Sequence, residues 1–212
     1  MRIIKGNKQL NMDKKALTEA VLGYKLVEID LGTGDGRFVY KKALDNPKVF
    51  FIGIDPAEKQ LEIFSRKAVR KKLNNLLFVV GSIEILPEEL VGIANKVYIN
   101  MPWGTLLESI VKPVEKSLYN LRSLLKPGGT AEIVFGYAPQ LEPSETKRLS
   151  LPDVSLDYIK SQLIPVYENL GFKLLELQEF GTRELESIQS TWGKGLKMQN
   201  KRHFFRITTV KQ

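Results

Sequence analysis

Short apolar runs alternate with amphipathic stretches along most of this chain. Seven of the runs have the length and the β-branched or aromatic content of buried strands. The strands that we expect are residues 26–31, 50–55, 76–80, 96–100, 130–136, 173–180 and 203–210. Strands that alternate with helices favour an α/β fold, a Rossmann-like, mostly parallel sheet with helices on both faces.

Two of the stretches between the strands have the periodicity of amphipathic helices. Ala57, Leu61, Phe64 and Ala68 recur at intervals of four, three and four residues, which places them on one helix face. Residues 106–125 form a second helical pattern, and Lys-Pro-Gly-Gly at 126–129 indicates where it stops. The segments 138–155 and 182–202 do not follow the alternation, and we expect them to be recognition linkers.

The composition excludes several kinds of chemistry. With 212 residues, 43% of them hydrophobic, the chain can bury one core of its own, so we expect a single domain over residues 1–212. The lack of cysteine and the single histidine, His203, exclude disulfides, thiolate zinc sites and histidine-rich metal sites. No signal peptide or membrane span is visible, so we expect a cytoplasmic protein that binds neither a metal nor a membrane.

Positive charge is concentrated in two stretches. Thirty-two Lys and Arg against 24 Asp and Glu give a formal net charge of +8, which suggests a polyanionic partner. Five of the seven residues from 66 to 72 are basic, although the solvated last turn of a helix would also explain this run. Residues 194–212 contain six Lys or Arg and no acidic residue, and part of this stretch lies in an expected loop.

The clearest chemical motif is Asp-Leu-Gly-Thr-Gly-Asp-Gly-Arg at 30–37, directly after the first expected strand. Its glycines allow a tight turn and a close approach of the backbone to a ligand. A dinucleotide fingerprint would need its third glycine at position 37, where this chain has Arg37, which argues against NAD. Asp55 ends the second strand, where it can bind both ribose hydroxyls of a nucleoside. Turn and acid together predict an S-adenosylmethionine pocket, although a capped turn without a ligand is the structural alternative.

Five segments together resemble the aminoglycoside-resistance 16S rRNA methyltransferases of the Kam/Npm group. They are Asp30–Arg37, Gly-Ile-Asp-Pro at 53–56, Met-Pro-Trp-Gly-Thr-Leu-Leu at 101–107, Ser-Thr-Trp at 190–192 and Phe-Phe-Arg at 204–206. The resemblance extends nearly end to end, and the 101–107 segment is its most specific part. It implies a class I S-adenosylmethionine-dependent methyltransferase with a seven-stranded sheet and an antiparallel last strand. Such an enzyme methylates N1 of adenine 1408 in the decoding site of the 30S subunit.

The resemblance also implies roles for particular residues. The target adenine would lie between Trp103 and Trp192, near the backbone of Met101 and Pro102. Cofactor contacts would come from Asp30, Gly32, Gly34, Asp35, Asp55, Pro56, Ser82, Ile83, Glu84, Asn100, Thr105 and Ser190. Contacts with 16S rRNA would come from Arg66, Lys67, Arg70, Lys71, Lys72, Lys147, Arg148, Lys194, Lys197, Lys201, Arg202 and Arg206. We expect a monomer without an obligate protein partner.

The two tryptophans suit this chemistry because a base inside folded rRNA must be extruded before it can react. Extrusion costs a few kcal/mol, and each aromatic stack returns roughly 1–3 kcal/mol. Adenine N1 carries a free lone pair at neutral pH, so attack on the sulfonium methyl needs no general base, and the indole faces stabilise the resulting cation. Catalysis would then consist mainly of orientation. His203 is interpreted as an ordinary strand residue, and core packing is the alternative role for each tryptophan.

Three departures from the family pattern leave alternatives open. The loop at 70–75 is short, and Gly195 and Asn200 occupy positions where arginines are expected, which affects docking on the ribosome. Asn100 occupies a position that is expected to be apolar. Asn-Met-Pro-Trp at 100–103 also resembles the Asn-Pro-Pro-aromatic loop of amino methyltransferases, which would make adenine N6 the target. A noncatalytic RNA-binding protein that retained the fold is a further alternative.

Overall fold

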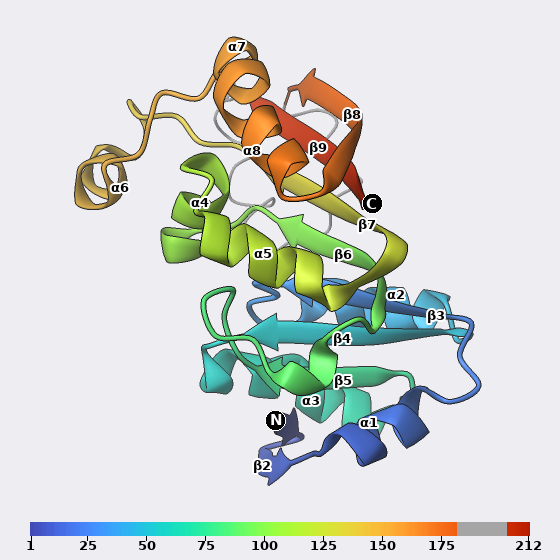
Figure 1. The fold of residues 1–212 in the computed structure, drawn as a ribbon. Coiled ribbons are helices and arrows are strands. Elements are labelled where there is room, and N and C mark those ends of the chain that lie inside the picture. The colour runs from blue at the N-terminus through green and yellow to red at the C-terminus, as the bar shows by residue number, and fades with distance from the viewer. Residues whose placement is uncertain (182–202) are drawn as a thin grey trace.

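A nine-stranded mixed sheet runs through the described part of the molecule (Figure 1). The computed structural model describes residues 1–181 and 203–212. The strands are β1 (Arg2–Lys5), β2 (Lys8–Asn11), β3 (Leu26–Leu31), β4 (Val49–Asp55), β5 (Leu76–Val80), β6 (Ala94–Asn100), β7 (Leu125–Phe135), β8 (Phe172–Phe180) and β9 (Phe204–Lys211). Their order across the sheet is β2-β1-β5-β4-β3-β6-β7-β9-β8.

The central strands β5, β4, β3, β6 and β7 pair in parallel, as the alternating pattern predicts. The last strand, β9, is antiparallel to both of its neighbours, β7 and β8, which confirms that expectation. The expected number of seven strands is too low, because β1 and β2 form a hairpin that pairs antiparallel with β5. These are four-residue strands, and all of β2 is exposed, so neither shows the alternation of a buried strand.

Helices cover both faces of the sheet. They are α1 (Lys14–Val21), α2 (Arg37–Asp45), α3 (Glu58–Arg70), α4 (Gly104–Val111), α5 (Glu115–Leu124), α6 (Pro143–Leu149), α7 (Leu156–Tyr158) and α8 (Ile164–Asn169), with a 3₁₀ turn η1 (Glu88–Leu90) and a π turn η2 (Ile159–Leu163). The helix expected over 106–125 is in fact α4 and α5. Pro113 disfavours helical backbone at Lys112 and has no N–H to donate, so the helix is interrupted between Val111 and Glu115.

The segment that follows α5 also differs from the expectation. The Lys-Pro-Gly-Gly sequence at 126–129 lies within β7, not in a loop before it. The register between β6 and β7 shifts from Ala94–Leu125 to Lys96–Thr130, so the strand bulges there. A Cβ at Gly129 would lie 3.0 Å from the Ala94 carbonyl oxygen, so a side chain would crowd the neighbouring strand. Helix α5 stops where expected, but the Lys-Pro-Gly-Gly residues that follow it form part of β7 instead of a turn.

Of three hydrophobic clusters among the described residues, the two largest hold the layers together, one on each face of the sheet. The larger contains residues of α1, α4, α5 and η2, such as Leu17, Ile110 and Leu121, packed on the inward side chains of the strands. The smaller contains Leu61, Phe64 and Ala68 of α3, which confirms the predicted buried face of that helix. In Figure 1, α4 and α5 lie on the near side of the sheet and α2 on the far side.

The parallel strands β3, β4, β5 and β6 end at one edge of the sheet, and the loops after them are adjacent in space. Ligands bind at this edge in open α/β sheets, so the topology brings the expected site residues together. Among the helices of residues 1–181 and 203–212, none is both long and apolar enough to cross a membrane.

Candidate active site

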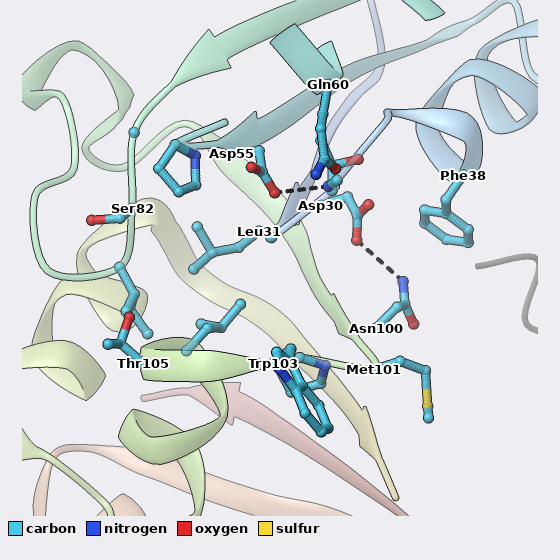
Figure 2. A pocket seen from close by; sticks show the side chains of 18 of the residues that line it. Asp30, Leu31, Phe38, Asp55, Gln60, Ser82, Asn100, Met101, Trp103 and Thr105 are labelled. Atoms are coloured by element: carbon cyan, nitrogen blue, oxygen red, sulfur yellow. Dashed lines mark hydrogen bonds between the residues drawn. The ribbon is translucent and has the colours of Figure 1, made fainter. Parts of the chain in front are cut away.

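A pocket of about 270 Å³ opens at the carboxyl edge of the sheet, among the ends of β3, β4, β5 and β6. It is lined by the predicted cofactor and base residues that lie within the described part of the chain: Asp30, Gly32, Gly34, Asp35, Asp55, Pro56, Ser82, Ile83, Glu84, Asn100, Met101, Pro102, Trp103 and Thr105. Figure 2 shows Asp30 and Asp55 directed into this pocket, with Trp103 on the opposite wall. Ser190 and Trp192 lie outside the described residues.

The glycine turn takes a backbone shape that only glycine adopts without strain. Gly32, Gly34 and Gly36 have φ values of 79°, 59° and 80°, in the left-handed region. A Cβ at Gly32 would lie 2.4 Å from Leu106 Cδ2, and one at Gly36 would lie 2.2 Å from Phe78 Cε1. At Gly32 and Gly36 a side chain would therefore be disfavoured both by the backbone conformation and by contacts with neighbouring side chains.

Asp55 at the end of β4 stabilises this turn. One carboxylate oxygen accepts a hydrogen bond from the Gly34 N–H and the other from the Ala57 N–H, each at 2.8 Å. Burial raises the pKa of the Asp55 carboxyl, and these two bonds oppose the rise. Each oxygen retains a second lone pair for a hydroxyl donor in the pocket. This arrangement suits a carboxylate that binds the two hydroxyls of a ribose.

Asp30 at the end of β3 is almost completely buried, with 2% of its surface exposed. Burial raises the pKa of its carboxyl to about 7. The Asn100 side-chain amide donates a hydrogen bond to Asp30 Oδ1 at 3.2 Å and opposes that rise (Figure 2). A carboxylate in this setting favours a cationic partner, such as the amino group of a methionine moiety.

Hydrogen bonds at the pocket join the loop after β5, with Ser82 and Glu84, to Thr105 in the first turn of α4. Burial acts to raise the pKa of Glu84, but hydrogen bonds from Ser82 and Thr105 hold it below its usual range. The loop after β5 is thereby joined to the first turn of α4. Asp35 binds Arg37 instead, accepting from its backbone N–H at 3.0 Å and from its guanidinium at 3.1 Å.

The loop that carries Trp103 has an unusual backbone. Met101 has a φ of 52°, a left-handed conformation that is rare for a residue with a side chain. Its N–H donates to the Val134 carbonyl at 2.7 Å, and its side chain packs with Phe180 and Phe204. Trp103 follows as the N-cap of α4, with 40% of its surface exposed. The indole therefore lies at the rim of the pocket, where an incoming ring can reach it.

Several lining residues were not predicted. Gln60 of α3 and Phe38 of α2 contribute to the pocket, as do Leu31, Thr33, Gly81 and Leu106. Thr33 lies inside the glycine motif and could have been inferred from it. Gln60 and Phe38 depend on how the first turns of α3 and α2 pack over the sheet, which no local pattern indicates. His203 lies outside the pocket, directly before β9, with its Nδ1 2.5 Å from Glu179 Oε1.

The predicted rRNA-binding residues that the structure describes lie on or next to three different elements, α3, α6 and β9. Arg66, Lys67, Arg70, Lys71 and Lys72 lie along the second half of α3 and just after it, and Lys67 Nζ sits 4.0 Å from the Phe64 ring centre. Lys147 and Arg148 lie on α6, which packs against α4 on the other face. Arg206 of β9 donates to Gln178 Oε1 at 3.0 Å. Lys194, Lys197, Lys201 and Arg202 lie outside the described residues.

This combination of sheet order, glycine turn, ribose-type carboxylate and pocket defines a class I S-adenosylmethionine-dependent methyltransferase. The sequence model of the NpmA family, described as 16S rRNA (adenine(1408)-N(1))-methyltransferase, matches residues 2–211. This chain belongs to that family. Within residues 1–181 and 203–212 no group of three or more potential metal ligands is present.

Known proteins support the assignment over the full length. A 16S rRNA (adenine(1408)-N(1))-methyltransferase of Escherichia coli is 38% identical over 213 residues, covering 98% of this chain and 97% of that protein. The crystal structure of the aminoglycoside resistance methyltransferase NpmB1 is 34% identical, with a TM-score of 0.86 over 100% of this chain and 99% of that one. The crystal structure of a variant of the 16S rRNA (adenine(1408)-N(1))-methyltransferase from Catenulisporales acidiphilia, solved with its cosubstrate SAM, is 27% identical. Its TM-score is 0.88, and the match covers 99% of this chain and 96% of that one.

Proposed function

We propose that this protein transfers the methyl group of S-adenosylmethionine to N1 of adenine 1408 in 16S rRNA of the assembled 30S subunit, which confers aminoglycoside resistance. The observation that carries the proposal is the pocket. It combines a buried carboxylate, a ribose-type carboxylate and a partly exposed indole around one cavity, in a chain that matches its family over residues 2–211.

The residues in the pocket have separable tasks. S-adenosylmethionine supplies an activated methyl group on a sulfonium. Asp30 holds the cofactor's amino group, the turn at Gly32 receives its methionine moiety, and Asp55 binds its ribose. Ser82, Ile83 and Glu84 border the adenine ring of the cofactor. This division accounts for one buried and one partly buried carboxylate at the ends of adjacent strands.

Trp103 stacks on the extruded target base, and Trp192 supplies the second face. Because N1 of adenine has a free lone pair, the transfer needs no proton acceptor, and none of the carboxylates has to act as one. A base held in line with the methyl group can gain much of the rate from orientation alone. The indole faces also stabilise the positive charge that passes from sulfur to the base.

The position of Asn100 favours N1 over N6 as the target. Its amide nitrogen donates to Asp30 on the neighbouring strand, so the side chain is engaged at the cofactor end of the pocket. In the amino methyltransferase loop, the corresponding amide binds the exocyclic amine of the base. The Asn100 amide nitrogen is therefore engaged with the Asp30 carboxylate, which ties this side chain to the cofactor end of the pocket.

One docking surface on rRNA consists of the basic half of α3 and the hairpin beside it, and Lys147 and Arg148 of α6 form a second surface on the other face of the sheet. Gly6, Asn7, Arg66 and Arg70 line one groove, where the β1–β2 turn meets α3. The hairpin is fixed in place, since the Gly6 N–H donates to Ser65 Oγ at 2.8 Å and Ser65 Oγ donates to the Ile4 carbonyl at 2.9 Å. Exposed Lys5 and Lys8 extend the charge along the hairpin. Such a surface binds phosphates without reading sequence.

We further propose that the protein works as a single-domain monomer in the cytoplasm, with no obligate protein partner. Residues 138–155 and 182–202 are its recognition linkers. The assembled subunit, not free rRNA, presents the phosphates of several helices in the arrangement that two separate basic surfaces can contact.

Methyl transfer to intact 30S subunits and to free 16S rRNA, followed by primer extension, tests this function. The proposal requires incorporation into 30S subunits, little incorporation into free rRNA, and a reverse-transcription stop next to adenine 1408. Subunits that are already methylated at this position are the control and should accept no further methyl. Incorporation without a stop at this site would contradict the proposal.

A further inference from the structure

The loop between β5 and β6 forms one end of the pocket. Four of its residues line the cavity: Gly81, Ser82, Ile83 and Glu84. In Figure 2, Asp55 lies between Asp30 and Ser82. If the cofactor's amino group binds Asp30 and its ribose binds Asp55, its nucleobase lies against this loop.

A tight turn gives the loop its shape at this point. The Ser82 N–H donates to the Ile85 carbonyl at 3.3 Å, and the Ile85 N–H donates to the Ser82 carbonyl at 3.1 Å. Because these two bonds close the turn, the carbonyl groups of Ile83 and Glu84 need donors from elsewhere. The Ile83 side chain is buried, whereas that of Ile85 is 78% exposed, so packing holds the turn on one side only.

Asn120 of α5 donates to both of these carbonyl groups. Its Nδ2 lies 2.8 Å from the Ile83 carbonyl oxygen and 3.3 Å from the Glu84 carbonyl oxygen. A side-chain amide has two N–H hydrogens, so one residue can satisfy both acceptors. Asparagine is a poor helix former, because its amide competes for backbone groups, and Asn120 lies in the middle of α5. The contact with the loop, and not the helix itself, accounts for this residue.

Helix α5 is packed firmly against the sheet. Leu118 and Leu121 are fully buried in the larger hydrophobic cluster. The helix also binds the far end of the same loop, where the Gly92 N–H donates to the Ser123 carbonyl at 2.8 Å. Asn120 therefore connects the pocket end of the loop to an element that is itself held by the core.

We propose that Asn120 is a positioning residue for the cofactor: its amide fixes the turn at Ile83 and Glu84 in the shape that receives the nucleobase of S-adenosylmethionine. Asn120 itself lies outside the lining of the pocket, so it acts through the loop. When the turn is fixed in advance, binding does not have to order it, and affinity is higher. This inference rests on the proposed function, which places the nucleobase against this loop.

Two substitutions of Asn120 test this role, with calorimetry of S-adenosylmethionine binding as the measurement. Asn120→Asp puts a carboxylate against two carbonyl oxygens and should raise the Kd at least about tenfold. Asn120→Ala removes the donor at a helix position that alanine favours, so it should fold and raise the Kd about threefold. The same two changes at Asn169, the exposed last residue of α8, are the matched controls and should leave the Kd within about twofold.

Kinetics and a truncated ligand separate positioning from a general loss of structure. At saturating S-adenosylmethionine, the Asn120 variants should keep kcat and the KM for 30S subunits within about twofold of the parent, because the turn meets the nucleobase and not the transferred methyl group. 5′-Methylthioadenosine contains the nucleobase and the ribose but no amino acid. Its Kd should rise in Asn120→Asp by the same factor as that of S-adenosylmethionine.

A folded Asn120→Asp protein with a parent-like Kd would overturn the inference, and so would a rise in the Kd for S-adenosylmethionine that 5′-methylthioadenosine does not share. If the aspartate variant does not fold, the alanine variant decides by the same two measurements. A parent protein that binds no S-adenosylmethionine would instead refute the proposed function. A parent that binds it, with variants that bind it equally well, would refute only the role of Asn120.

Discussion

Lowering the pH from 7.5 to 5.5 should weaken S-adenosylmethionine binding through protonation of Asp30. This carboxyl is 2% exposed, and burial raises its pKa to about 7 in the cofactor-free protein. The cofactor's amino group, an α-amino group with a pKa of roughly 7.7–8.0, stays mostly protonated over this range and favours the ionised carboxylate. Affinity is therefore present above the pKa of Asp30 and is lost as the pH falls through it.

The size of the effect follows from the ionised fraction of Asp30. With a pKa of about 7, roughly 76% of Asp30 is ionised at pH 7.5 and roughly 3% at pH 5.5. If only the ionised form binds well, the apparent Kd rises by this ratio, about 25-fold over two pH units. Most of the increase in apparent Kd should occur below pH 7, where the Kd approaches a change of about tenfold per pH unit.

Isothermal titration calorimetry across pH 5.5–7.5 measures this effect, and two variants identify its origin. Asp30→Asn should bind weakly at every pH and lose most of the dependence. Asn100→Leu removes the amide that donates to Asp30 at 3.2 Å, so its affinity should begin to fall at a higher pH than in the parent. A parent Kd that is constant over this range, or an equal slope in Asp30→Asn, would show that Asp30 does not bind the amino group.

Three further predictions concern the ribose, the target base and the docking surface. Asp55→Ala should weaken S-adenosylmethionine binding in calorimetry by at least about tenfold without unfolding the protein, since a hydrogen bond to a charged group contributes roughly 1.5–3 kcal/mol; an unchanged Kd would refute the ribose assignment. Trp103→Ala should keep the parent melting temperature within a few degrees and most cofactor affinity but lose methyl transfer, with partial rescue by Phe and less by Leu. If it is instead destabilised by about 3–5 kcal/mol, the indole is a packing residue. Replacement of Lys5 and Lys8 by Gln should reduce the salt dependence of 30S binding by about two units of slope, and an unchanged slope would remove the hairpin from the interface.

The central sheet was predictable because its strands are buried on both faces. The predicted bounds 26–31 and 76–80 agree with β3 and β5, and the others differ by one or two residues, except that β7 begins at Leu125, well before the expected residue 130. The hairpin was missed because its strands are short, β1 is stabilised by pairing with β5, and β2 pairs with β1 but buries none of its residues. The helical pattern over 106–125 looked continuous because the apolar positions of α4 and α5 belong to the same cluster, although Pro113 separates the two helices.

The residues expected to bind the cofactor were predictable as a group because they lie at the ends of strands in recognisable motifs. Asp30, Asp55 and Trp103 were expected from these motifs and from the family resemblance, and all three line one pocket. Contacts between segments that are distant in the sequence could not be predicted from local motifs. Helix α6 contacts α4 only because the linker after β7 folds back on α4, and no spacing in the sequence indicates that return.

The central claim is that methylation occurs on N1 of a single adenine. The most direct test is mass spectrometry of 16S rRNA from 30S subunits treated with the protein and S-adenosylmethionine. The decoding-site fragment is isolated and digested to nucleosides, and 1-methyladenosine is resolved from 6-methyladenosine by chromatography. The account predicts one 1-methyladenosine per subunit, located at position 1408 and absent when Trp103→Ala is used. Detection of 6-methyladenosine in that fragment, or of no methylated adenosine at all, would contradict it.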